Sequence, residues 1–64
     1  MARDPNRIPE MLAALEAAWR RNPDWRLGQV VVNAMPIDWP SSDMFHVEDE
    51  DMLNGLLELV EVYR

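Results

Sequence analysis

The sequence predicts an all-α fold: a compact three-helix domain with an irregular apolar segment, over about 36–47, packed between the second and third helices. Two stretches, 7–21 and 49–63, carry apolar residues at helical spacings of three and four. A third stretch between them opens with residues that favour a helix start. The 64 residues are enough for one small helical domain, 1–64, which has a limited core and no cysteine to cross-link it.

The first predicted helix spans 7–21. Asn6 is the expected cap, because it leaves Pro9 in the first turn, where a backbone N–H is not needed. Glu16 and Arg20 stand four residues apart in the order that stabilises a helix. The apolar stripe consists of Ile8, Met11, Leu12, Leu15 and Trp19.

The second predicted helix follows at once, with Asn22 as its cap and Pro23 in its first position. Trp25, close to this turn, is expected to pack between the helices. Pro36 ends the helix, because the residue before a proline resists the α conformation.

A strand over 27–33 is the alternative, because Gly28 weakens a helix and Val30–Val32 is a β-branched run. The helix is favoured, since a lone strand would lack a partner strand of comparable quality. Gly28 then either allows another helix to approach closely or is a tolerated local cost.

The segment 36–47 holds two prolines and a serine pair, and therefore reads as irregular. It is too apolar for a free loop, so its large side chains are expected to anchor it across the helices. These anchors are Met35, Ile37, Trp39, Met44, Phe45 and Val47.

The third predicted helix spans about 49–63 and begins with carboxylates, which the positive end of a helix dipole favours. Its apolar stripe is Met52, Leu53, Leu56, Leu57, Val60 and Tyr63. We expect it to cross the other two helices through Leu53, Leu56, Leu57 and Val60.

Charge divides the chain into two halves. Twelve acidic and six basic residues give a net charge of −6, and the basic side chains gather toward the N-terminus while carboxylates gather after residue 38. Attraction within the monomer is the simpler interpretation, with Arg26 or the pair Arg20–Arg21 facing 48–51. The alternative is an acidic face presented to a basic partner.

No residue pattern indicates catalysis. His46 is the single histidine, the serines lack a positioned base, and the acidic run 48–51 lacks the spacing of a calcium loop. The tryptophans are expected in the core. We therefore predict that the protein is not an enzyme and needs no cofactor or metal. A small metal-dependent enzyme using His46 and the carboxylates of 48–51 is a weaker hypothesis.

Several short runs resemble a group of small uncharacterised bacterial and phage helical proteins and, more distantly, the YihD family. They are residues 3–8, Trp19 with 22–24, 26–29, and Phe45 with 47–49 before a leucine-rich helix. The resemblance implies a compact helical fold and no catalytic residue.

The function predicted from these observations is a non-catalytic protein-interaction or self-associating module, whose partner is another protein or a second copy. No apolar run has membrane length and no targeting signal is apparent, which predicts a cytoplasmic protein that does not bind a membrane. We also expect no direct binding of nucleic acid. The alternative is an acidic phage-type inhibitor that mimics nucleic acid and blocks a basic site. The candidate partner-binding residues are Met35, Ile37, Trp39, Met44, Glu48, Asp49, Glu50 and Asp51.

Overall fold

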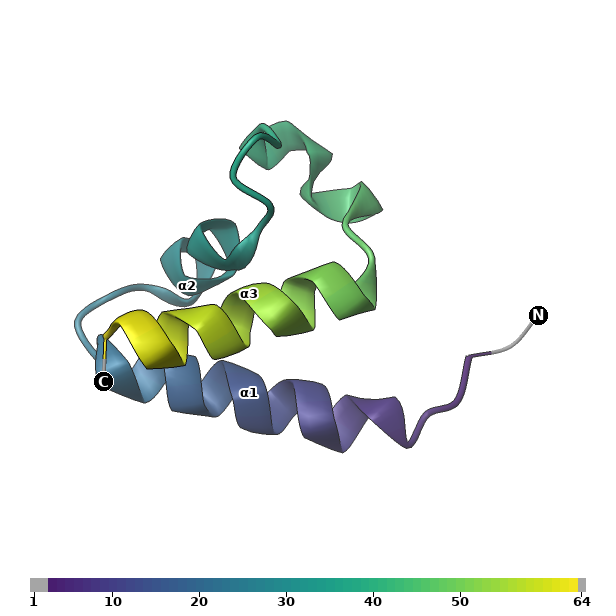
Figure 1. Ribbon diagram of the computed structural model, residues 1–64, viewed down its shortest axis with the longest axis horizontal. Helices are drawn as coiled ribbons and strands as arrows, with labels where there is room; N and C mark the ends of the chain where they lie inside the picture. The colour runs from purple at the N-terminus through teal and green to yellow at the C-terminus, as the bar shows by residue number, and fades with distance from the viewer. Residues whose placement is uncertain (1–2, 64) are drawn as a thin grey trace.

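The computed structural model describes residues 3–63 and confirms the all-α fold, with no strand in that range (Figure 1). Three α-helices and one 3-10 helix follow one another along the chain: α1 (Arg7–Arg21), α2 (Leu27–Ala34), η1 (Ser41–His46) and α3 (Asp49–Val62). Within residues 3–63 no helix is long and apolar enough to cross a membrane.

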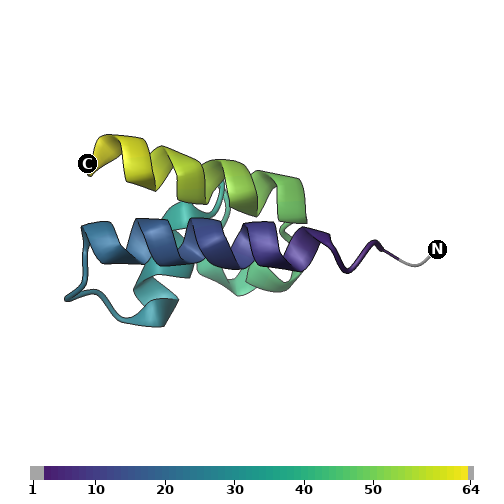
Figure 2. The same ribbon diagram turned by 90° about the horizontal axis from the view of Figure 1, so that it is seen from below.

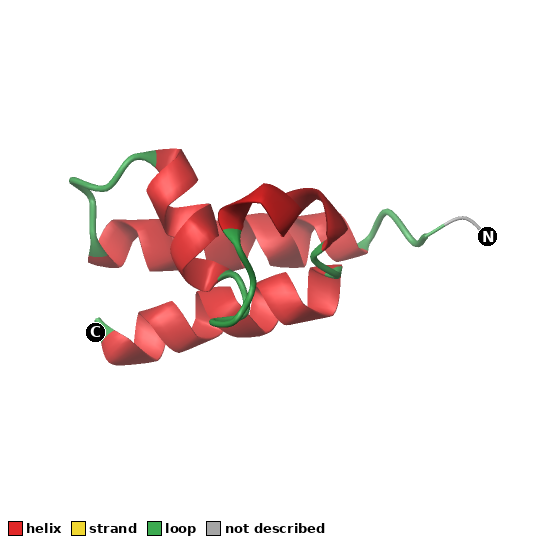
Figure 3. Cartoon of the chain, turned by 90° about the horizontal axis from the view of Figure 1, so that it is seen from above, coloured by secondary structure: helices red, strands yellow, loops and turns green. Residues whose placement is uncertain are grey.

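The helices form two layers. α1 and α3 lie side by side and run in the same direction, and α3 packs against both α1 and α2. α2 and η1 lie together on one face of this pair, as the views from below and above show (Figures 2 and 3). The parallel direction of α1 and α3 places the first turns of the two helices at the same end of the molecule.

α1 begins and ends where the sequence predicts. Asn6 occupies the cap position, but its side chain makes no capping hydrogen bond. Instead, the backbone N–H of Asn6 donates to the Asp4 carboxylate at 2.9 Å. Asp4 therefore orders the chain where it enters the helix, while Asn6 does not cap the helix through its side chain.

The predicted start of α2 is wrong, because residues 22–26 form a turn and the helix begins at Leu27. The indole N–H of Trp19 donates to the carbonyl oxygen of Trp25 at 2.7 Å, which holds the turn against the end of α1. The Asn22 side chain does not cap the helix, and its buried amide nitrogen finds no hydrogen-bond partner among the described residues. At the actual start of the helix, the Gln29 side chain accepts a hydrogen bond from the backbone N–H of Arg26 at 2.7 Å.

Residues 28–33 are helical, so the strand alternative is wrong. The helix ends at Ala34 as predicted, with Met35 in an extended conformation before Pro36. The stretch after it is less irregular than expected, because residues 41–46 form a 3-10 helix. The backbone N–H of Asp43 bonds to the carbonyl oxygen of Pro40 at 2.9 Å and opens that helix.

The predicted anchors of this segment behave differently from one another. Met35 is buried, and Met44 and Val47 are partly buried. Ile37 and Phe45 are 97% and 92% exposed, so the expectation that they anchor the segment is wrong. An apolar side chain in a turn or short helix has no register that forces it inward, whereas a stripe on a long helix does.

The core is small and built largely from small side chains. Its buried cluster contains Ala14, Ala18, Val30, Ala34, Leu56 and Leu59, contributed by all three α-helices. Val30 retains no exposed surface. Larger side chains, including Trp19 and Trp25, pack around this cluster while remaining partly exposed.

The buried face of α3 differs from the predicted one, and Tyr63 at its end is 43% exposed. Leu56 is buried as expected, but Leu57 is 49% exposed and Leu59 is buried in its place. Leu57 lies about 100° round the helix from Leu56, which turns it away from α1 and α2. The apolar stripe of α3 is wider than the face that its neighbours cover.

Close approach between helices occurs at Gly55 and not at Gly28. A Cβ atom at Gly55 would overlap the carbonyl oxygen of Ala34 and lie 2.6 Å from its carbonyl carbon. Around a Cβ atom at Gly28 nothing lies within 4 Å. The backbones of α2 and α3 therefore meet at Gly55, and Gly28 is a local cost to helix stability.

The two glycines give a matched pair of substitutions. We expect Gly55→Ala to destabilise the fold by about 1–3 kcal/mol, because the new methyl group must push α2 and α3 apart. We expect Gly28→Ala to be neutral or to stabilise by up to about 1 kcal/mol, since alanine favours a helix and meets no neighbour. Urea unfolding followed by circular dichroism measures both changes. Equal effects of the two substitutions would contradict the close contact at Gly55.

Candidate interaction surface

The residues around the contact between α2 and α3 form an open groove of about 710 Å³, here called the α2–α3 groove. One wall comes from the end of α2 and the chain that follows it, and the other comes from α3. Its lining residues are Val32, Asn33, Ala34, Met35, Pro36, Ile37, Trp39, Asp51, Asn54, Gly55, Glu58, Leu59 and Val62.

Large apolar side chains border this groove without being covered. Ile37 is almost fully exposed, Val62 is 65% exposed, and Val32 and Trp39 are also exposed to solvent. Below them, Ala34 and Leu59 are buried parts of the core. The groove thus has a floor fixed by the packing of α2 on α3 and an apolar border available for contact.

Two carboxylates stand on the α3 side of the groove. Asp51 and Glu58 are exposed, and neither forms an ion pair within residues 3–63. They lie two helical turns apart on α3, about 10 Å along its axis. Their negative charges are therefore available to a basic group that enters the groove.

The structure divides the predicted partner-binding residues into two groups. Met35, Ile37, Trp39 and Asp51 come together in the α2–α3 groove. The remaining four do not line it: Met44 is a partly buried residue of η1, Glu50 is exposed elsewhere on α3, and Glu48 and Asp49 lie at the start of α3.

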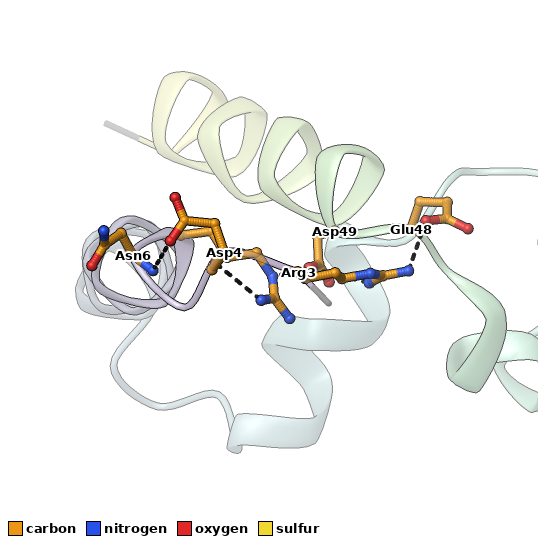
Figure 4. Close-up of polar contacts among 6 residues, drawn as sticks. Arg3, Asp4, Asn6, Glu48 and Asp49 are labelled. Atoms are coloured by element: carbon orange, nitrogen blue, oxygen red, sulfur yellow. Dashed lines mark hydrogen bonds and ion pairs between the residues drawn. The ribbon is translucent and has the colours of Figure 1, made fainter. Parts of the chain in front are cut away.

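Glu48 and Asp49 are engaged within the monomer (Figure 4). The Nε atom of Arg7 lies 2.6 Å from the Oδ2 atom of Asp49. The guanidinium of Arg3 reaches Asp49 at 3.4 Å and Glu48 at 3.5 Å. Attraction between the two halves of the chain is thus realised here, through these two arginines.

The predicted partners of the acidic run were wrong. Arg20 pairs with Glu16 on its own helix at 2.8 Å, and neither Arg21 nor Arg26 forms an ion pair with residues 48–51 in the described chain. Because α1 and α3 run in the same direction, the start of α1 meets the start of α3 (Figure 1). The end of α1, which carries Arg20 and Arg21, lies at the opposite end of the molecule.

The hydrogen bond from Arg7 holds the pKa of Asp49 below its ordinary value of 3.8. Desolvation opposes this shift, and the charges of Arg7 and Arg3 add to it. The carboxylate is therefore ionised at neutral pH and is paired with two arginines, which partly offset its charge toward an external partner.

The remaining sequence candidates do not assemble into a reactive site. His46 is exposed and contacts the edge of Phe45, with ring centroids 5.2 Å apart. Within residues 3–63 no three side chains of the metal-binding types converge. Trp19 and Trp25 pack on the core as predicted, but Trp39 borders the groove, which corrects its predicted core position.

Nine groove residues were not predicted from the sequence as site residues: Val32, Asn33, Ala34, Pro36, Asn54, Gly55, Glu58, Leu59 and Val62. Val32 and Val62 lie outside the apolar stripes of their helices, and this position off the stripe was the available signal. Gly55 gave a second signal, because a glycine inside a strong helix indicates a close neighbour.

Comparison of the chain with protein-family models, curated proteins and solved structures found no match. The resemblance to the YihD family therefore stays a prediction.

The contact between Arg7 and Asp49 predicts a specific dependence of stability on pH. Since the pKa of Asp49 is lower in the folded chain than in the unfolded one, the stabilisation is present above pH 3.8 and is lost as pH falls through the folded-state pKa. We expect Arg7→Gln to lower stability at pH 7 and to lose this effect in acid. Carboxyl carbon chemical shifts should show the pKa of Asp49 rising in the variant.

Arg26→Gln is the matched control, because it removes an exposed arginine that forms no ion pair with Asp49 among the described residues. It should leave the titration of Asp49 unchanged. An Asp49 titration that is the same in wild type and Arg7→Gln would rule out the contact.

Proposed function

We propose that this chain is a non-catalytic protein-interaction module that binds a partner segment in the α2–α3 groove. The observation that supports the proposal is the row of uncovered apolar side chains, Val32, Ile37, Trp39 and Val62, around a groove with a buried floor. Exposed apolar side chains around a groove are typical of binding sites.

The charges of the groove favour a basic partner. Asp51 and Glu58 would pair with lysine or arginine side chains, while the apolar border takes leucine, isoleucine or aromatic side chains. A second copy of this chain would instead bring its own Asp51 and Glu58 to the same border, and like charges would repel. The proposed occupant is therefore a segment of another protein that carries apolar residues flanked by basic ones.

The helix contact beneath the groove supports tight binding. Gly55 fixes the spacing of α2 and α3, so the floor is already formed in the free protein. On the side of this protein, binding then requires ordering of the few exposed side chains and not of its backbone. This reduces the conformational entropy that association costs.

An acidic inhibitor that mimics nucleic acid is the second candidate. The observation that favours it is the exposure of Glu50, Asp51 and Glu58 on α3. Asp38, in the turn between α2 and η1, is exposed as well. Engagement of Glu48 and Asp49 by Arg3 and Arg7 reduces the charge available for such mimicry. The interaction module is favoured because its apolar border would otherwise have no role.

Selection of random peptides on the immobilised protein tests the proposed function. We expect the selected peptides to combine large apolar residues with lysine or arginine. Ile37→Glu should weaken their binding at least about tenfold, because it places a charge among the apolar contacts. Leu57→Glu alters an exposed leucine of α3 that does not line the groove and should leave binding unchanged.

A second pair of variants tests the carboxylates. Asp51→Asn combined with Glu58→Gln should weaken binding and reduce its dependence on salt. Glu10→Gln combined with Asp24→Asn removes the same charge outside the groove and serves as the control. Peptides that bind Ile37→Glu as well as wild type would count against the groove. Capture of a nucleic-acid-binding protein that duplex DNA displaces would favour the acidic inhibitor.

A further inference from the structure

Asn54 is followed directly by Gly55 in the middle of α3. An asparagine loses its side-chain amide when the backbone nitrogen of the next residue attacks the side-chain carbonyl carbon. A glycine in the next position favours this attack, because it has no Cβ atom to hinder it. The other asparagines, at positions 6, 22 and 33, precede arginine, proline and alanine. Asn54 is therefore the asparagine of this sequence whose local chemistry most favours deamidation.

The helix opposes this reaction. The nitrogen of Gly55 lies inside α3, where its N–H is directed to the carbonyl oxygen of Asp51, four residues earlier. The helical ψ angle of Asn54 also differs from the angle that a five-membered ring through its side chain requires. The side chain itself is exposed in the α2–α3 groove, so burial does not protect it. Protection of Asn54 therefore depends on the backbone.

Ala34 of α2 adds a second constraint. A Cβ atom at Gly55 would overlap the carbonyl oxygen of Ala34, so the backbone of α2 lies directly against this part of α3. Ring closure rotates the peptide between Asn54 and Gly55, and Ala34 obstructs that rotation. The attack therefore requires α3 to separate from α2 and to open at this point.

From these observations we propose that Asn54 is a site of spontaneous modification, gated by the contact between α2 and α3. When the contact opens, the nitrogen of Gly55 bonds to Cγ of Asn54. The C–N bond of the carboxamide breaks, and its nitrogen leaves as ammonia with the proton of the Gly55 N–H. Water then opens the resulting succinimide ring at one of its two carbonyl carbons. The product is either aspartate or isoaspartate at position 54.

The two products differ in their effect on the fold. Aspartate leaves the backbone unchanged and adds a carboxylate to the groove, between Asp51 and Glu58 along the helix. Isoaspartate routes the backbone through the former side chain, which adds one methylene group to the main chain in the middle of α3. That insertion displaces Gly55 relative to Ala34, where no extra atom fits. A chain converted to isoaspartate therefore cannot restore the original helix contact.

Peptide mapping of the protein after incubation in mildly alkaline buffer measures the conversion at each asparagine. Mass spectrometry detects the loss of the amide, and chromatography separates aspartyl from isoaspartyl peptides. We expect conversion at Asn54 to be at least about tenfold faster in urea that unfolds the chain, because the rate follows the population of the open state. Asn33 is the internal control, since it is also exposed, and it should convert more slowly than Asn54 in urea.

Val30→Ala tests the gate without urea. It leaves a cavity at the fully buried valine of α2 and should speed conversion at Asn54 at least about tenfold. The control on the same helix is Gly28→Ala, which meets no neighbour and should convert no faster than wild type. A Val30→Ala chain that does not fold should convert at the rate of the wild type in urea, so the comparison remains decisive.

Asn54→Asp separates the effect of the new charge from that of the inserted backbone atom. It carries the carboxylate on an unchanged backbone and should stay helical. The isoaspartyl chain, isolated by chromatography, should unfold at a lower urea concentration than Asn54→Asp. Circular dichroism measures both transitions.

Three results would overturn the inference. They are equal conversion of Asn54 in the folded and the urea-unfolded chain, wild-type conversion in a destabilised Val30→Ala chain, and an isoaspartyl chain as stable as Asn54→Asp. None of these measurements uses a ligand of the α2–α3 groove, so their outcome is independent of the proposed function.

Discussion

The backbone contact between Gly55 of α3 and Ala34 of α2 determines how the rest of the molecule packs. With the two helices this close, Val30 is enclosed completely between them and the alanine face of α1. A side chain at position 55 would separate the helices and open the space around Val30 to water. The small residues Ala14 and Ala18 on α1 serve the same geometry, because they let a third helix approach the same point. The core is therefore dense but thin.

A thin core leaves much apolar surface on the outside. This explains both the α2–α3 groove and a second open groove along α1, which is lined by Leu12, Leu15, Glu16, Trp19, Arg20 and Pro23. Small side chains at the helix crossings force the larger ones toward the margins, where they are only partly covered. The charged side chains then determine how the two grooves differ. The α2–α3 groove carries the carboxylates Asp51 and Glu58, while the groove along α1 carries the ion pair of Glu16 and Arg20. The same packing constraint thus produces two surfaces with different electrostatic character.

The extent of α1 and α3, and the helical state of residues 28–33, could be predicted from sequence because their signals are local. Spacing and an acidic first turn act within one helix and need no knowledge of its neighbours. The start of α2 could not be predicted, because the hydrogen bond between the Trp19 indole and the Trp25 carbonyl depends on how the turn folds back.

Charge pairing was limited in the same way. Composition showed that two halves attract, but not whether α1 and α3 run in the same direction. Arg7 lies in the first turn of α1, where the helix dipole disfavours a cation. The parallel arrangement brings Asp49 beside it, and the carboxylate offsets that charge. The candidate groove was predicted in part, through Met35, Ile37, Trp39 and Asp51, because its other members become neighbours only when α2 crosses α3.

The contact between Trp25 and Tyr63, with ring centroids 5.4 Å apart and nearly perpendicular planes, joins the turn after α1 to the end of α3. Such a contact can form only after the chain has closed a loop that contains α2 and η1, and closure of a long loop costs entropy before any contact is gained. We therefore expect docking of α3 to be a late event in folding, with Val30 uncovered until it occurs. Because the chain also contains Trp19 and Trp39, the part of the fluorescence change that Tyr63→Leu removes would report on that late step.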